Sequence, residues 1–268
     1  MASYNVLTVA GSDSGGGAGI QADLKTFSAL GVYGASVLTA LTAQNTRGVA
    51  AVHAVPADFV AAQLDAVFSD IRVDAVKIGM LATADIVAAV AERLRHWQPA
   101  VVVLDPVMVS KGGAPLLAPE AEAAIRAHLL PLADIVTPNL GEAAALLGVP
   151  VAADEAAMLA QAEALLALGA RRVLIKGGAL AGASDSPDWL VGASSGRVRL
   201  DGARAPHGYT HGTGCTLSAA LAALYPLRGD WSATARDAKA YLNAALAAAD
   251  RIEVGGGIHP VHHFHAYW

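Results

Sequence analysis

The feature of this 268-residue chain that most limits its possible folds is a regular alternation of two kinds of segment. Short runs rich in β-branched residues alternate with Ala- and Leu-rich segments of helical period, which is typical of βα units around a mainly parallel sheet. The expected strands are Val6 to Ala10, Ala35 to Ala40, Ala75 to Ile78, Val101 to Leu104, Ile135 to Thr137 and Arg172 to Ile175. The expected helices include Gly19 to Leu30, Ala57 to Phe68, Thr83 to Arg95, Glu155 to Leu168, Thr213 to Leu224 and Ser232 to Arg251.

The alternation changes after Lys176. Two strand-like segments, Asp188 to Val191 and Arg197 to Leu200, flank a Gly/Ser turn and predict a hairpin, which would add an antiparallel edge to the sheet. The composition is 54% hydrophobic but only 5% aromatic, so Ala, Val and Leu must build the core, as helices packed over a buried sheet require. No stretch that is polar, Pro-rich or Ser-rich is long enough to be an interdomain linker. We therefore expect residues 1–268 to form a single α/β domain.

Charge and composition exclude several classes of protein. The formal net charge is -5, and no Lys/Arg run alternates with aromatic residues, so nucleic-acid binding is not expected. The N-terminus lacks the basic region of a signal peptide, and no apolar run approaches the roughly 18 residues that span a bilayer. We expect a cytoplasmic protein that makes no membrane contact. The single cysteine, Cys215, cannot form an internal disulfide, which leaves burial or reactivity to explain it.

Polar and glycine-rich segments follow the expected strands one after another. In a parallel α/β sheet the ligand binds outside the carboxyl ends of the strands, so these segments should meet at one edge. They are residues 11–19, 42–46, 79–80, 105–108, 138–142 and 176–178.

A glycine turn at His211-Gly212-Thr213-Gly214-Cys215-Thr216 leads directly into an Ala/Leu helix. Unpaired backbone N–H groups and the positive end of the helix dipole converge there, which suits an anion such as a transferring phosphoryl group. The same helix start would lower the pKa of the Cys215 thiol and let it act as a base toward a substrate hydroxyl. In the alternative interpretation the turn only redirects the chain, with Thr213 as the N-cap and Cys215 as a small buried filler.

The glycine-rich loop at residues 11–19 resembles a phosphate cradle, but it has neither Walker spacing nor a proper GxGxxG pattern. A flexible turn between strand and helix explains it equally well. Asp23 follows on the first turns of the next helix, where it could reach a ligand or complement the helix dipole.

Two carboxylates, Asp105 and Glu142, follow strands at the expected ligand edge and could hold Mg²⁺ through water. Each has an ordinary alternative: Asp105 as a turn residue, and Glu142 as the partner of Asn139 in a capping box. Lys176 ends an apolar strand and precedes two glycines, so its ammonium could lie among the phosphates of a ligand. Alternatively, Lys176 is an ordinary solvated lysine at the end of a strand.

Two further polar side chains lie in or just after otherwise apolar strands. Lys77 implies a buried ion pair or a position at the sheet edge. Gln44 offers an amide donor and acceptor, which suit the edge of a heterocycle.

Histidines cluster near the C-terminus at positions 259, 262, 263 and 265. Terminal disorder or a subunit contact is a better explanation than a metal site, because no partner carboxylate is evident in the sequence.

Taken together, these segments resemble the ribokinase superfamily, and specifically its hydroxymethylpyrimidine/phosphomethylpyrimidine kinase branch, over essentially the whole chain. The motifs that carry the resemblance, in the order of that branch, are 9–23 (VAGSDSGGGAGIQAD), 41–46 (LTAQNT), 77–81 (KIGML), 104–108 (LDPVM), 137–139 (TPN) with Glu142, and 210–216 (THGTGCT).

The resemblance implies a three-layer α/β/α kinase, usually a homodimer, that uses ATP and magnesium. Its substrate would be 4-amino-5-hydroxymethyl-2-methylpyrimidine and then the monophosphate of that compound, in thiamine biosynthesis, with both transfers in one site. The nearest alternative is a pyridoxal or dual-specificity kinase, which Gln44 and Met80 disfavour. A catalytically silent pyrimidine sensor is a third interpretation, and the complete set Asp105, Glu142, Lys176 and Cys215 argues against it.

The resemblance also implies a role for each matching residue. Cys215 would be the base, where sugar kinases of the superfamily usually place an aspartate, and residues 212–214 would form the anion hole. The substrate-binding residues would be Gln44 at the aminopyrimidine edge, with Gly11, Asp23, Met80 and Val107. The residues that bind the nucleotide phosphates would be Lys176, Thr210 and Thr213. The residues that bind the metal would be Asp105 and Glu142.

Overall fold

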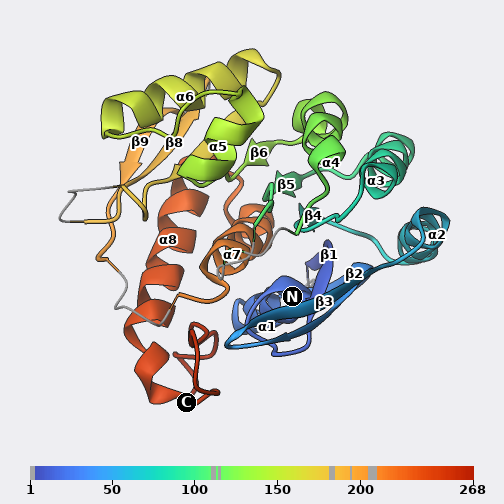
Figure 1. Ribbon diagram of the computed structural model, residues 1–268, viewed down its shortest axis with the longest axis horizontal. Helices are drawn as coiled ribbons and strands as arrows, with labels where there is room; N and C mark the ends of the chain where they lie inside the picture. The colour runs from blue at the N-terminus through green and yellow to red at the C-terminus, as the bar shows by residue number, and fades with distance from the viewer. Residues whose placement is uncertain (1–3, 110–112, 114–115, 181–184, 194, 205–209) are drawn as a thin grey trace.

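The computed structural model describes residues 4–109, 113, 116–180, 185–193, 195–204 and 210–268. At its centre lies a nine-stranded sheet with the strand order β3-β2-β1-β4-β5-β6-β7-β8-β9 (Figure 1). The strands are β1 (Asn5–Asp13), β2 (Tyr33–Asn45), β3 (Gly48–Ala54), β4 (Ala75–Ile78), β5 (Val102–Leu104), β6 (Ile135–Val136), β7 (Arg172–Lys176), β8 (Asp188–Gly192) and β9 (Gly196–Leu200).

The middle of the sheet is parallel and both of its edges are antiparallel. Strands β2, β1, β4, β5, β6 and β7 run parallel to one another. Strand β8 pairs antiparallel with β7, and β8 and β9 form the hairpin that the sequence predicted. The second antiparallel edge, β3 against β2, was not expected. Most residues of β3 are exposed, so the strand lacks the alternation of buried and exposed side chains by which a half-buried strand is recognised.

Helices cover both faces of the sheet, which confirms the three-layer α/β/α prediction (Figure 1). One face carries α1 (Gly19–Ala29), α7 (Thr213–Arg228) and α8 (Trp231–Ala247). The other carries α2 (Ala57–Phe68), α3 (Ala84–Trp97), α4 (Pro119–Ala124), α5 (Leu140–Leu147) and α6 (Glu155–Ala167). Among the helices that the structure describes, none is both long and apolar enough to cross a bilayer.

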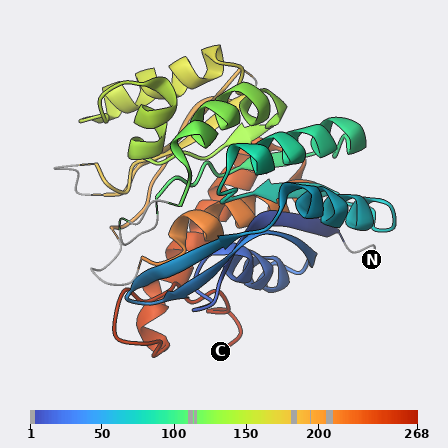
Figure 2. The same cartoon turned by 45° about the vertical axis from the view of Figure 1, so that its right-hand side comes forward.

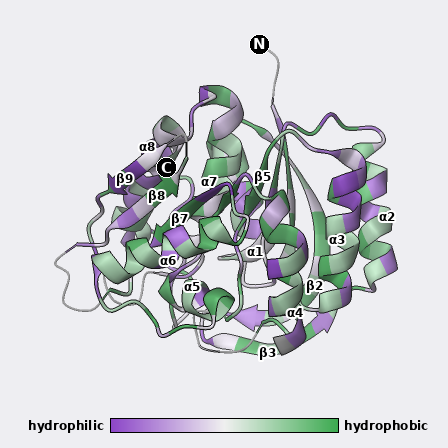
Figure 3. Ribbon diagram, turned by 90° about the horizontal axis from the view of Figure 1, so that it is seen from above, coloured by the Kyte–Doolittle hydropathy of each residue, from purple (hydrophilic) through white to green (hydrophobic). Residues whose placement is uncertain are grey.

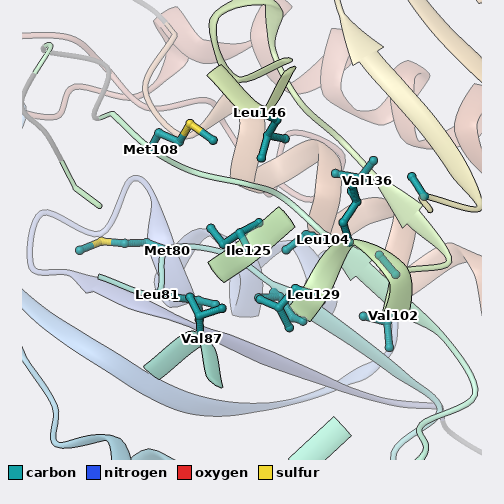
Figure 4. Close-up of a cluster of buried hydrophobic side chains, with 14 of the residues drawn as sticks. Met80, Leu81, Val87, Val102, Leu104, Met108, Ile125, Leu129, Val136 and Leu146 are labelled. Carbon is teal, nitrogen blue, oxygen red and sulfur yellow. The ribbon is translucent and has the colours of Figure 1, made fainter. Parts of the chain in front are cut away.

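Each face of the sheet has its own hydrophobic core. In Figure 4 side chains of β5 and β6, including Leu104 and Val136, meet Ile125, Leu129 and Val87 from the covering helical segments. The core on the opposite face is built mainly from alanines and leucines of α7 and α8. Figure 3 shows the central strands coloured largely hydrophobic, while the helices mix hydrophobic and hydrophilic residues. Small aliphatic side chains therefore supply the packing, as the low aromatic content required.

Side-chain caps fix where several helices begin. Thr83, Asp154 and Asp230 each accept a backbone N–H from the first turn of α3, α6 and α8, respectively. Each such cap contributes about 1 kcal/mol to helix stability. The predicted bounds of α2 and β4 agree with the structure, and the other predicted helices differ mainly at their ends.

The C-terminal segment is packed against the protein, so the expectation of terminal disorder is wrong for the cluster of histidines. The turn between β2 and β3 meets this segment, where the N–H of Ile258 donates to the Thr46 carbonyl (2.7 Å; Figure 2). His263 is buried with its Nε2 3.1 Å from Thr216 Oγ1, and burial, with the nearby charge of Lys25, lowers its pKa to about 3. Within the described residues, no group of three or more His, Cys, Asp or Glu side chains is placed to hold a metal.

Candidate active site

A lysine–aspartate pair, which we call the open pair, lies beside the start of α7. Lys176 ends β7 and Asp105 directly follows β5, so two strands of the parallel sheet deliver them to the same edge. Lys176 Nζ lies 2.9 Å from Asp105 Oδ1, and the Lys176 side chain keeps 14% of its surface exposed. The Thr137 hydroxyl donates to the same carboxylate (3.0 Å) and orients it. The Ser218 hydroxyl lies 3.3 Å from its other oxygen, with the Gly214 and Cys215 carbonyl oxygens nearer, at 3.0 and 3.1 Å.

Both members of the open pair are charged at neutral pH. Burial alone would raise the pKa of Asp105, but the ammonium groups of Lys176 and Lys77 outweigh burial and lower it. For Lys176 burial acts in the opposite direction, and the carboxylates of Asp105 and Glu142 outweigh it, so the pKa of Lys176 is raised. A partly exposed lysine with fixed carboxylates behind it can meet an anionic ligand with little reorganisation.

Glu142 has both of the placements that the sequence allowed. It forms the capping box of α5 with Asn139, accepting the Asn139 N–H (2.8 Å) while its own N–H donates to the Asn139 side chain (3.0 Å). Its Oε2 also lies 3.8 Å from Lys176 Nζ. The cap therefore holds this carboxylate toward the open pair, and two carboxylates surround one ammonium. The excess negative charge and the all-oxygen donor set are of the kind that suits a magnesium ion held with water and phosphate oxygens.

The glycine turn before α7 packs tightly against the glycine-rich loop that follows β1. Gly212 is the N-cap of α7 with φ +79°, and a Cβ there would lie 1.9 Å from the carbonyl oxygen of Gly17. The interpretation of Thr213 as the cap is therefore wrong, because Thr213 is the first helical residue. A Cβ on Gly214 would lie 3.3 Å from Lys176 Nζ and 3.5 Å from Asp105 Oδ2, so the helix start and the open pair face the same space.

Cys215 is held as a neutral thiol, contrary to the sequence-based expectation. Burial is the largest influence and raises the pKa of the thiol to about 11, although the ammonium of Lys77 and the backbone N–H of Gly19 lower it. Part of the residue still reaches solvent. The helix dipole therefore does not lower this pKa below its ordinary value, because the protein around the sulfur disfavours the charged form more strongly.

A second lysine–aspartate pair, the sealed pair, lies deeper in the same sheet. Lys77 of β4 and Asp23 of α1 approach to 2.8 and 2.9 Å, and both side chains are 0% exposed. Thr8 donates a further hydrogen bond to Asp23 (2.6 Å). The buried ion pair expected for Lys77 is confirmed. Asp23, in contrast, can neither touch a substrate nor act as an exposed dipole partner in this structure, because its whole side chain is enclosed.

The glycine-rich loop after β1 is neither a phosphate cradle nor a flexible turn. The buried carboxylate of Asp13 accepts the backbone N–H groups of Gly15 (2.8 Å), Gly17 (3.0 Å) and Ala18 (2.8 Å). Burial would raise the pKa of Asp13, but these bonds and His211 together lower it. The donors that a phosphate would need are therefore occupied by a side chain of the loop itself.

The expected substrate-binding residues fall into two groups. Gly11 interrupts the register between β1 and β2, and a Cβ there would lie 3.0 Å from the sulfur of Met80, so these two residues are neighbours. Val107 is half-buried beside Asp105, whose carbonyl accepts its N–H (2.8 Å). Gln44 lies elsewhere, near the end of β2, with its side-chain Nε2 3.5 Å from His211 Nε2.

Four polar residues of this region were not singled out from the sequence. Thr137 orients Asp105 and Ser218 lies beside it, while Asp13 and His211 contact one another at 2.8 Å. The position of Ser218, one helical turn after Gly214, could have indicated that it faces the same site. Nothing local could have paired Asp13 with His211, which lie 198 residues apart.

Comparisons with known proteins give a consistent result. The family model described as phosphomethylpyrimidine kinase matches residues 13–262. The hydroxymethylpyrimidine/phosphomethylpyrimidine kinase of Escherichia coli (strain K12) is 59% identical over 268 residues, which cover 100% of both chains.

Two solved structures have the same fold. The ADP complex of Bacillus subtilis pyridoxal kinase has a TM-score of 0.89 with 38% identity over 98% of each chain. The phosphomethylpyrimidine kinase of Clostridium difficile 630 has a TM-score of 0.78 with 43% identity, covering 89% of this chain and 97% of its own. The predicted fold class is confirmed.

Proposed function

This chain belongs to the phosphomethylpyrimidine kinase family, and we propose that it transfers the γ-phosphoryl group of ATP to 4-amino-5-hydroxymethyl-2-methylpyrimidine and then to the resulting monophosphate. The observation that carries the proposal is the position of the open pair, Lys176 with Asp105, beside the N-terminus of α7. Pre-aligned donors at one point are what phosphoryl transfer requires. The identity of 59% over the full length to an enzyme of that name supports the pyrimidine as the acceptor.

In the proposed reaction the phosphates lie between Lys176 and the first turn of α7. The ammonium, the backbone N–H groups of residues 213–214 and the hydroxyls of Thr210 and Thr213 bind the nucleotide phosphates and the charge that develops on the transferring group. Asp105 and Glu142 would hold Mg²⁺, which when bound neutralises phosphate charge. Thr137 keeps Asp105 oriented throughout.

Cys215 is the proposed base for the hydroxymethyl group of the substrate. With a pKa of about 11 the thiolate is a minor form at neutral pH, and the Lys77 ammonium favours it electrostatically. The thiolate accepts the hydroxyl proton as the hydroxyl oxygen bonds to the γ-phosphorus and the bond to the β-phosphate oxygen breaks. A loose transition state needs only modest help from a base, which is compatible with a thiol that is mostly protonated.

The proposed ring site uses Gln44, Gly11, Met80 and Val107, without Asp23. A series of close contacts connects two members of this group, Gly11 and Met80, to Cys215. The Gly19 N–H bonds to the thiol, a Cβ on Gly19 would lie 2.3 Å from the Gly11 carbonyl oxygen, and Gly11 lies against Met80. The ring site and the transfer site are therefore proposed to be continuous.

A panel of acceptors tests the proposal. ADP release with MgATP is measured for hydroxymethylpyrimidine, its monophosphate, pyridoxal and ribose, and the phosphorylated products are identified by mass. We expect both pyrimidines to be substrates with a kcat/KM above that of pyridoxal, and ribose to be inactive. The absence of ADP release with either pyrimidine would overturn the proposed function.

Pyridoxal phosphorylation is the second candidate. The observation in its favour is that the pyridoxal kinase structure has a higher TM-score, 0.89, than the phosphomethylpyrimidine kinase structure, 0.78. In the same panel, a kcat/KM for pyridoxal well above that for hydroxymethylpyrimidine would make this the main activity.

We also propose that residues 1–268 act as one kinase domain and that two copies associate. A single sheet runs through the described chain, so no linker is needed. Large hydrophobic side chains are exposed on β2, β3 and α2, including Leu41 (48%), Val52 (42%) and Phe59 (60%). Association of two copies would remove exposed apolar side chains of this kind from water. Light scattering during size-exclusion chromatography should give twice the monomer mass, and a monomer at micromolar concentration would refute the association.

A further inference from the structure

A cluster of polar side chains at the ends of β1 and β2 has no part in the proposed phosphoryl transfer. It consists of Asp13, His211, Gln44 and Thr42, and of these only Gln44 is proposed to touch the substrate. His211 Nε2 lies 2.8 Å from Asp13 Oδ2 and 3.5 Å from Gln44 Nε2. At the other end of the amide, Gln44 Oε1 lies 3.2 Å from Thr42 Oγ1, which in turn lies 2.8 Å from the Ser12 carbonyl oxygen.

The position of the proton on His211 follows from its neighbour. Asp13 is buried and its carboxylate is already bonded to three backbone N–H groups, so it is ionised and can only accept hydrogen bonds. His211 Nε2 must therefore carry a proton, whether the ring is neutral or charged. A nitrogen that carries a proton cannot accept a hydrogen bond from the amide N–H of Gln44.

The position of the proton on the Thr42 hydroxyl also follows from its neighbours. The Ser12 carbonyl oxygen can only accept, and it is the nearer of the two oxygens around the Thr42 hydroxyl, so it takes the single hydroxyl proton. Thr42 Oγ1 is then left as an acceptor. In this orientation Thr42 Oγ1, an acceptor, faces another acceptor, Gln44 Oε1. At the other end of the amide the protonated His211 Nε2 faces another N–H donor, Gln44 Nε2. Both contacts are unfavourable.

A half-turn of the Gln44 amide removes both conflicts at once. The two ends of the amide have the same shape, so its hydrogen-bond partners decide which end is oxygen. After the half-turn Nε2 donates to Thr42 Oγ1. Oε1 then faces the His211 N–H, which donates mainly to Asp13 at 2.8 Å and reaches Oε1 at 3.5 Å as the longer branch of a shared hydrogen bond. We propose that Asp13 and His211 are positioning residues that fix this orientation of Gln44 and thereby select the ring that the site accepts.

The amide presents a ligand with one acceptor and one donor side by side, and its orientation decides which way round the ligand edge must lie. One lone pair on Oε1 and one N–H on Nε2 remain for a ligand. This combination matches an amino group next to a ring nitrogen, as when a glutamine amide pairs with the edge of adenine. A 4-aminopyrimidine has that edge. In pyridoxal the ring nitrogen and the hydroxyl are separated by a substituted carbon, so the amide cannot bind both in the same way. The inference deepens the proposed function and rests on it.

A matched pair of variants tests the inference. His211→Leu removes the N–H at similar volume, whereas His211→Gln keeps a donor that can reach both Asp13 and Gln44. Each is assayed with the aminopyrimidine and with 5-hydroxymethyl-2-methylpyrimidine, which lacks the amino group. We expect His211→Leu to raise KM for the aminopyrimidine by roughly 10- to 100-fold, to change KM for the analogue and for ATP by less than about threefold, and His211→Gln to recover most of the loss.

Two results would overturn the inference. Equal losses with the aminopyrimidine and the analogue would mean that His211 acts only through the fold. The second readout needs no substrate: long-range ¹H–¹⁵N spectra should show His211 protonated at Nε2, and a ring protonated at Nδ1 alone would contradict the argument. Because that measurement is independent of turnover, inactivity of the wild-type protein toward the aminopyrimidine would overturn the proposed function and would be recognised separately.

Discussion

The two lysine–aspartate pairs beside the start of α7 have similar geometry and different access. In the sealed pair, Lys77 and Asp23 lie 2.8 Å apart and neither side chain is exposed. In the open pair, Lys176 and Asp105 lie 2.9 Å apart, and the lysine keeps 14% of its side-chain surface exposed. The sealed pair has one carboxylate for each ammonium, whereas the open pair shares its ammonium with Glu142.

The difference in access distinguishes an ion pair that stabilises the fold from one that acts in the site. An ion pair without access to water or ligand can act only through the protein, and its loss leaves an uncompensated buried charge. An ion pair at the surface of a site can exchange its partner for a phosphate or a metal at little cost. Contact distance alone would not distinguish the two pairs, but exposure and charge balance do.

Lys77→Met should have the largest effect, and the effect should be on stability. It leaves Asp23 buried without its partner, which costs about 3–5 kcal/mol of unfolding free energy. Urea unfolding at pH 7.5 measures this loss. Lys77→Met combined with Asp23→Asn removes both charges and should recover at least half of it. If the single variant lost less than about 1 kcal/mol, Asp23 would not be a buried charge.

Lys176→Met should impair turnover more than folding. The loss of one charged donor to the transferring phosphoryl group should lower kcat by roughly 10²- to 10³-fold, which corresponds to about 3–4 kcal/mol of transition-state stabilisation. Asp105 keeps the Thr137 hydroxyl and the nearby charge of Lys77, so unfolding free energy should fall by less than about 2 kcal/mol. Wild-type turnover in this variant would remove Lys176 from the phosphate site.

The pH profile tests Cys215, which lies between the two pairs. Because burial raises the pKa of the thiol to about 11, the thiolate fraction increases about tenfold for each pH unit below that value. If the thiolate is the base, kcat should rise by roughly 10²-fold from pH 7 to pH 9 when chemistry limits the rate. Cys215→Ser should lose this rise. A flat wild-type profile, with the chemical step shown to be limiting, would exclude the thiolate as the base.

Glu142 and Asn139 should show the smallest effects, and the difference between them is informative. Asn139→Ala removes one half of the capping box and should cost about 1 kcal/mol of stability with little change in magnesium dependence. Glu142→Gln keeps much of the cap while removing a charge near Lys176, so the Mg²⁺ concentration for half-maximal rate should increase severalfold. An unchanged requirement would leave Glu142 as a cap alone.

The repeating architecture could be predicted from the sequence because it depends on local patterns. Helix α2 and strand β4 were bounded correctly, and the hairpin β8–β9 was expected from its Gly/Ser turn. Strand β3 was missed because most of its residues are exposed, so no alternation marks it. Asp105 was singled out because it follows a strand and Lys176 because it ends one, and the topology then brought them together.

The errors at the site concern burial and partners distant in sequence. The Cys215 pKa was expected to fall because the helix start was visible in the sequence and the surrounding protein was not. Asp23 was expected either to reach a ligand or to complement the helix dipole, because its partner, Lys77, is 54 residues away. The glycine loop resembled a phosphate cradle, yet the carboxylate of Asp13 takes its N–H groups. Such competition between a ligand and an internal partner becomes visible only in three dimensions.

Calorimetry of nucleotide binding tests the contrast between the two pairs most directly. The ATP analogue AMP-PCP, with Mg²⁺, is titrated into the Lys176→Met variant and into the Lys77→Met, Asp23→Asn double variant. The first variant should bind roughly 10- to 100-fold more weakly than wild type, the scale of a charge-assisted phosphate contact. The folded double variant should bind within about threefold of wild type. Unchanged binding to Lys176→Met, together with a large loss in the sealed-pair variant, would show that the open pair does not bind the phosphates.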